Sequence, residues 1–137
     1  MKDIEHQKLA DGSILLEKVG NEIARIGEEF KAEYPEQTCG PIGAVVGATQ
    51  EADARYLRDK YPDVFFLIPG YGAQGGSGKD LKGFFNEDGL GAIINSSRGI
   101  IAAYKNEKYA EFGAEGYADA ARKATEDMIE DIRVNVF

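Results

Sequence analysis

The chain has 137 residues and a formal net charge of −8, a size and composition that favour one globular domain over residues 1–137. The negative charge argues against a general nucleic-acid surface, although a local basic pocket could still hold a phosphate ester. The single cysteine, Cys39, excludes an internal disulfide and a metal site built from several cysteines. No signal peptide or long apolar span is visible, so we expect a cytoplasmic protein that does not bind membranes.

The first predicted element is a long amphipathic helix. Apolar residues recur at helical spacing from residue 14 to residue 30, while charged residues fill the opposite face. Tyr34-Pro35 should end this helix, and Asp11 or Ser13 should cap its start, because their side-chain oxygens can accept hydrogen bonds from first-turn amides. His6, the only histidine, lies in the polar segment before the helix, where we expect solvated surface.

After the long helix, the pattern changes to three units in which a strand leads into a helix. Consecutive parallel strands joined by helical crossovers define an α/β fold, which keeps its binding loops at the carboxyl ends of the strands. The predicted elements are strand 42–46, a helix capped by Thr49 and running to Lys60, strand 64–68, helix 79–85, strand 91–95, a helical turn near Ile100, and a terminal helix over 117–132.

The central strand and the loop after it carry the strongest binding signal. Residues 64–68 are continuously apolar, which is typical of a parallel strand covered on both faces, and Pro69 should end the strand because proline cannot donate to a ladder. The glycines that follow permit positive φ angles and let backbone amides approach an anion, with the amide side chain of Gln74 among them. The alternative is a glycine-rich turn that binds no ligand.

A second candidate loop joins the third strand to the helical turn. This segment, Ser96-Ser97-Arg98-Gly99, places a guanidinium beside the backbone amides of a helix start, and the two together make a phosphate site. In (β/α)₈ barrels a phosphate site lies in the loops after the last two strands. The alternative is that Arg98 pairs with a surface carboxylate.

Two other motifs do not support a site. Gly76-Ser77-Gly78-Lys79 is similar to part of a nucleotide-triphosphate loop, but the first glycine of that motif falls on Ala73, and Asp80 stands where Ser or Thr should coordinate magnesium. The acidic and basic segment 59–63 lies at a helix end before a proline, and we expect it to be a solvated helix terminus.

Three longer motifs occur in a specific order and spacing: residues 43–49 (GAVVGAT), 67–76 (LIPGYGAQGG) and 95–100 (NSSRGI). They resemble the last three strands of orotidine 5′-phosphate decarboxylase in its longer bacterial subgroup, and the resemblance extends from about Lys8 to the carboxyl-terminal helix. The resemblance implies the fold of a (β/α)₈ (TIM) barrel, of which this chain holds the three carboxyl-terminal strand-helix units.

The resemblance also implies a function in pyrimidine biosynthesis. Members of the family are lyases that decarboxylate orotidine 5′-monophosphate to UMP with no metal or organic cofactor, usually as homodimers. By motif, Gln74 would bridge the phosphate and the pyrimidine side of the ligand, and Pro69 would border the pyrimidine. Arg98 would clasp the phosphate, helped by the amides of Ser97 and Arg98, although many relatives have glycine where Ser97 stands.

The family's catalytic Asp-x-Lys-x-x-Asp motif does not occur in this sequence. Since a complete barrel needs about 250 residues, we expect no catalytic residue in this chain, no activity from the chain alone, and a partner that supplies the missing amino-terminal barrel segment, or else self-association. Two alternatives stay open: another phosphate-binding barrel lyase, and an inactive self-associating partial barrel.

Overall fold

The computed structural model describes residues 2–48, 51–72 and 76–137. Three parallel strands form its sheet in the order β1-β2-β3, with Ala44 paired to Phe66 and Phe66 paired to Ala92. The elements in chain order are α1 (Lys2–Glu5), α2 (Leu15–Glu33), β1 (Ala44–Val45), α3 (Glu51–Lys60), β2 (Phe66–Pro69), α4 (Gly78–Leu81), η1 (Lys82–Phe84), β3 (Ala92–Asn95), α5 (Arg98–Ile101), η2 (Ala103–Lys105), η3 (Glu107–Phe112) and α6 (Tyr117–Val136).

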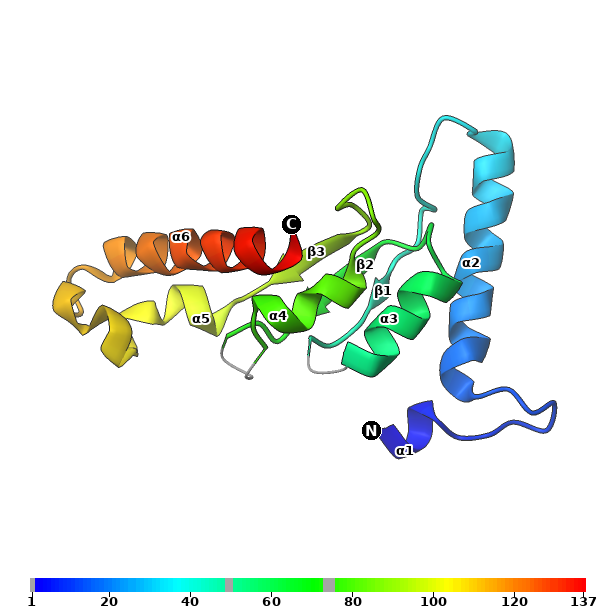
Figure 1. Ribbon diagram of the computed structural model, residues 1–137, viewed down its shortest axis with the longest axis horizontal. Helices are drawn as coiled ribbons and strands as arrows, with labels where there is room; N and C mark the ends of the chain where they lie inside the picture. Colours follow the sequence, from blue (N-terminus) through cyan, green and yellow to red (C-terminus); the bar gives the residue numbers. More distant parts are fainter. Residues whose placement is uncertain (1, 49–50, 73–75) are drawn as a thin grey trace.

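The arrangement is elongated, with the sheet near its centre (Figure 1). Helices α3 and α4 lie over one face of the sheet, α2 stands at one end of the molecule, and α6 with α5 forms the other end. The alternation of strand and helix confirms the predicted α/β order. Among the described helices, none is long and apolar enough to cross a membrane.

The main hydrophobic core lies between the sheet and the helices α3 and α4. Phe66 and Ile68 project from β2 into this core, and both are fully buried against Leu81 and Phe84. Successive side chains of a strand point to opposite faces, so residues two apart along β2 share the covered face. A second cluster packs η2 and η3 against α6 and consists of Ala103, Tyr109, Ala120 and Ala124.

The other face of the sheet is not covered by the described part of the chain. Val45, Leu67 and Ile93 are 72%, 40% and 54% exposed. The prediction that the central strand is covered on both faces is therefore wrong for this chain. Right-handed crossovers place α3 and α4 on the same side, and in a closed barrel the opposite side is filled only by the side chains of all its strands.

The start of α2 also differs from the prediction. Ile14 is the residue at the helix cap, and its amide donates to Glu17 Oε2 at 3.2 Å. The Asp11 carboxylate instead accepts hydrogen bonds from the amide and the hydroxyl of Ser13, at 3.0 and 2.6 Å. Both predicted caps are therefore used in the turn before the helix. Thr49, the other predicted cap, lies outside the described residues.

Arg58 is a buried cation near the amino ends of β2 and β3, and it is only 3% exposed. Its guanidinium lies 3.9 Å from the centre of the Phe66 ring. Burial lowers the pKa of Arg58, but guanidinium pKa values are so high that the group stays charged at neutral pH. Its three nitrogens donate to the carbonyl oxygens of Phe84, Tyr61, Pro62, Val64 and Gly91 at 2.8 to 3.1 Å.

Candidate functional site

The candidate site lies where β2 and β3 end. Pro69 pairs with Asn95 in the parallel register, so the loops that follow the two strands start side by side. A pocket of about 120 Å³ opens between these loops. Its lining consists of Pro69, Gly70, Tyr71, Asn95, Ser96, Ser97 and Arg98.

Arg98 is the first residue of α5, and Ser97 is its cap. First-turn amides have no preceding helical carbonyl to bond, so they are available to an anion. The Arg98 side chain is exposed and forms no ion pair with any residue that the structure describes. The alternative in which Arg98 pairs with a surface carboxylate therefore has no support within those residues.

The glycine loop after β2 turns sharply at its base. Gly70 and Gly72 have φ angles of 106° and 73°, which only glycine adopts readily. The Gly72 amide donates to the Gly76 carbonyl oxygen at 2.8 Å, and Tyr71 and Gly76 form a parallel bridge. The Ser96 hydroxyl donates to the Tyr71 carbonyl oxygen at 3.2 Å, which joins this loop to the loop after β3.

A larger cavity of about 530 Å³ adjoins this pocket and is bounded by α5, η2, η3 and α6. It shares Tyr71, Ser96 and Arg98 with the smaller pocket. Asp127 also lines this cavity and is paired with Lys108 and Lys123 at 2.7 and 2.8 Å. These hydrogen bonds hold the pKa of Asp127 well below its usual range, so it carries a fully compensated negative charge.

Three of the four predicted ligand-binding residues, Pro69, Ser97 and Arg98, thus surround one pocket. The fourth, Gln74, lies outside the described residues. Sequence reasoning missed Tyr71 and Ser96, which line the same pocket. Both belong to the motifs that predicted the site, so their positions next to Gly70 and Ser97 were the available signal.

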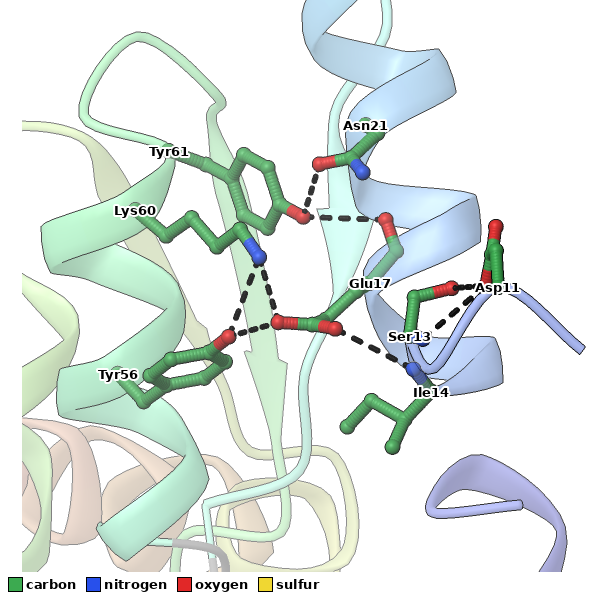
Figure 2. A network of polar contacts seen from close by, with 8 residues as sticks. All are labelled: Asp11, Ser13, Ile14, Glu17, Asn21, Tyr56, Lys60 and Tyr61. Carbon is green, nitrogen blue, oxygen red and sulfur yellow. Dashed lines mark hydrogen bonds and ion pairs between the residues drawn. The ribbon is translucent and has the colours of Figure 1, made fainter. Parts of the chain in front are cut away.

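The segment 59–63 lies away from this pocket, because α3 ends where β2 begins and the pocket lies where β2 ends. Lys60 is not simply solvated, contrary to the prediction. Its ammonium contacts Glu17 Oε1 at 2.5 Å, and the Tyr56 hydroxyl donates to the same oxygen (Figure 2). The hydrogen bond from Lys60, followed by those from Tyr56 and the Ile14 amide, lowers the pKa of Glu17 to about 2. This network joins α2 to α3.

A parallel sheet with its crossover helices on one face and its pocket at the carboxyl ends of the strands defines part of a (β/α)₈ barrel. The chain belongs to the orotidine 5′-phosphate decarboxylase / HUMPS family, whose sequence profile matches residues 6–112. This match confirms the resemblance seen in the three motifs.

The relatives are orotidine 5′-phosphate decarboxylases. That of Petrotoga mobilis is 46% identical over 135 residues, which cover 96% of this chain and 44% of the relative. That of Clostridium acetobutylicum is 39% identical over 133 residues, covering 96% of this chain and 43% of the relative. The solved structure of Leishmania donovani OMP decarboxylase superposes with a TM-score of 0.61 at 26% identity, covering 96% of this chain and 44% of that one. The chain therefore spans less than half the length of these proteins.

Proposed function

We propose that this chain supplies the phosphate-binding and pyrimidine-binding part of an orotidine 5′-phosphate decarboxylase, which converts orotidine 5′-monophosphate to UMP and carbon dioxide. The observation that carries the proposal is the meeting of Pro69, Ser97 and Arg98 around one pocket in a chain of this family. Arg98 would bind the ligand's phosphate through its guanidinium, and the amides of Ser97 and Arg98 would add to this grip. Pro69 would border the pyrimidine, and Gln74 would bridge the two ends of the ligand.

The reacting groups would come from another part of the barrel, because the Asp-x-Lys-x-x-Asp motif does not occur in this sequence. The phosphate is remote from the carbon that loses its carboxylate. Binding energy from such a remote group can nevertheless hold the reacting centre in an unfavourable environment and so lower the barrier. Arg98 should therefore affect turnover of the assembled enzyme as well as affinity.

The proposed partner is the amino-terminal segment of the barrel. Within the described residues, the apolar sheet face that carries Val45, Leu67 and Ile93 is uncovered, and each outer strand pairs on one side only. Unpaired strand edges tend to recruit further strands, and closing the sheet into a barrel removes them. As part of the same proposal, the assembled enzyme is a cytoplasmic homodimer, as the family resemblance implies.

The test is ligand binding by this chain combined with the amino-terminal segment of the Petrotoga mobilis relative. Arg98→Ala removes a charge-assisted contact, and such hydrogen bonds contribute about 1.5–3 kcal/mol, so UMP should bind at least about tenfold more weakly. Gln74→Ala should weaken UMP binding less, because a neutral hydrogen bond contributes about 0.5–1.5 kcal/mol. Calorimetry with UMP and with uridine separates the contribution of the phosphate to the affinity from that of the nucleoside.

The matched control is Arg122→Ala, which removes an exposed arginine of α6. Arg122 pairs with Glu126 and lines neither of the two pockets. It should leave both affinities unchanged. The defect of Arg98→Ala should nearly vanish for uridine, which offers no phosphate. An equal loss for UMP and uridine would show that Arg98 supports the fold or the base pocket, and the phosphate assignment would be wrong.

A further inference from the structure

The glycine loop after β2 is fastened to the last helix of the chain by one carboxylate. Asp131 lies on α6, and its Oδ2 accepts hydrogen bonds from the Tyr71 hydroxyl and from the Gly78 amide, both at 2.7 Å. Tyr71 is at the entry to the loop and Gly78 is at its exit, where α4 begins. A single oxygen therefore holds both Tyr71 and Gly78.

The carboxylate is itself fixed. Its other oxygen, Oδ1, accepts a hydrogen bond from Asn135 Nδ2 at 2.8 Å, and the same amide donates to the Asp131 carbonyl oxygen at 2.8 Å. The approach of α4 to α6 is close, because a Cβ at Gly78 would lie 2.6 Å from the Asp131 carbonyl oxygen. Burial and the hydrogen bond to Asp131 raise the pKa of Tyr71, so its hydroxyl remains a donor at neutral pH.

Tyr71 connects this anchor to the candidate site. It lines the pocket that Arg98 also lines, and its carbonyl oxygen accepts the hydrogen bond from the Ser96 hydroxyl. A shift of Tyr71 would therefore move the base of the glycine loop relative to the start of α5. Geometric errors of about 1 Å are enough to weaken a site that depends on positioned donors.

We propose that Asp131 is a positioning residue: by holding Tyr71 and Gly78, it sets where Tyr71 lies relative to Arg98 and the ligand's phosphate. The inference rests on the proposed function, since that function places the ligand's phosphate at Arg98, in the pocket that Tyr71 also lines. The loss of the Asp131 charge would by itself change phosphate binding in the opposite direction from the loss of positioning. An anion near a phosphate site repels the ligand, so removing that charge alone would strengthen phosphate binding. Positioning predicts weaker binding when Asp131 is lost.

The experiment compares UMP and uridine binding by wild type, Asp131→Ala, Asp131→Asn and Tyr71→Phe, each combined with the amino-terminal segment described above. We expect Asp131→Ala to weaken UMP binding about tenfold, the order of one lost hydrogen bond to a charged group, and to leave uridine unchanged. Asp131→Asn keeps an oxygen acceptor and should recover part of the loss. The double variant Tyr71→Phe/Asp131→Ala should be no weaker than Asp131→Ala, because both changes remove the same contact.

Glu130→Gln is the matched control for charge, because it removes a neighbouring exposed carboxylate that pairs with Arg133. It should not weaken UMP binding. A second readout needs no ligand: the Gly72 amide, which is hydrogen-bonded to Gly76, should exchange its hydrogen faster in Asp131→Ala than in wild type.

The outcomes separate the two proposals. Unchanged or stronger UMP binding by Asp131→Ala, in a wild-type background that prefers UMP to uridine, would overturn the positioning role and leave the proposed function intact. A wild type without that preference would refute the proposed function and, with it, the phosphate part of this inference. Unchanged exchange at Gly72 in Asp131→Ala would show that the carboxylate does not hold the loop.

Discussion

Replacing Arg58 with methionine should remove a large share of the stability of this chain. Methionine matches the length of the arginine stem but offers no donor. Of the five carbonyl oxygens that Arg58 contacts, three have another partner: Tyr61 and Gly91 each accept a backbone amide, and Pro62 accepts the Asn86 amide. The oxygens of Phe84 and Val64 have no other partner among the described residues.

The expected loss follows from these contacts. A buried acceptor left without a partner costs about 1–3 kcal/mol, so two such oxygens give about 2–6 kcal/mol. Removing the cation also recovers part of its desolvation cost, which places the expected loss in the lower part of this range, at about 2–4 kcal/mol. Domains of this size are stable by about 5–15 kcal/mol, so Arg58→Met should lower the unfolding midpoint severely.

Urea unfolding measures this loss through the midpoint and the slope. The matched control is Arg55→Met, one turn earlier on α3, where the exposed guanidinium pairs with the exposed Asp59 and with no other residue that the structure describes. It should change stability by less than about 0.5 kcal/mol. Arg58→Lys should fall between the two, because an ammonium cannot reproduce the planar fork of donors. If Arg58→Met stays within about 1 kcal/mol of wild type at an unchanged slope, the carbonyl bonds are not what Arg58 contributes.

Two further predictions concern acid stability and activity. Because the folded state lowers the pKa of Glu17 from 4.5 to about 2, the stabilisation from its contacts is complete above pH 4.5 and is lost as the pH falls toward about 2. Glu17→Gln should therefore flatten the acid limb of urea midpoints measured against pH, and an unchanged limb would contradict the assignment. The chain alone should release no carbon dioxide from orotidine 5′-monophosphate, whereas addition of the amino-terminal segment should restore release; turnover by the purified chain alone would refute the assignment of the chemistry to other strands.

The helices and strands could be predicted because their signals are local. Apolar periodicity located α2 and α6. The prediction of the α2 cap was wrong because the Asp11 carboxylate accepts hydrogen bonds from Ser13, and such short-range bonds compete with helix capping.

Charged residues at the end of α3 show the limit of sequence patterns. Arg58 and Lys60 stand two positions apart near a helix end, and both suit a solvated surface by composition. Tertiary packing turns Arg58 into the core and brings Lys60 to Glu17 on α2. The acceptors that decide these positions come from segments far apart in the sequence, so no local pattern could reveal them.

The residues in and around the candidate site also include some that the sequence could predict and one that it could not. Pro69, Ser97 and Arg98 could be grouped from the sequence, because the carboxyl ends of parallel neighbouring strands meet at one edge of a sheet. Asp131 could not be, since it belongs to a helix whose pattern indicates only one apolar face. Its contact with Tyr71 spans 60 residues and depends on how α6 packs against α4.

The residues that stabilise the fold and the residues that line the pocket therefore lie at opposite ends of the strands. Arg58 bonds carbonyl oxygens just before β2 and β3, whereas Arg98 and Tyr71 line the pocket just after them. The four residues of β2, at about 3.3 Å each, place these two edges roughly 13 Å apart. Sites that far apart with no shared partner usually contribute additively. Loss of the Arg58 cation should therefore change only the fraction of molecules that are folded, whereas loss of Arg98 or Asp131 should change the affinity of the folded molecules for UMP relative to uridine.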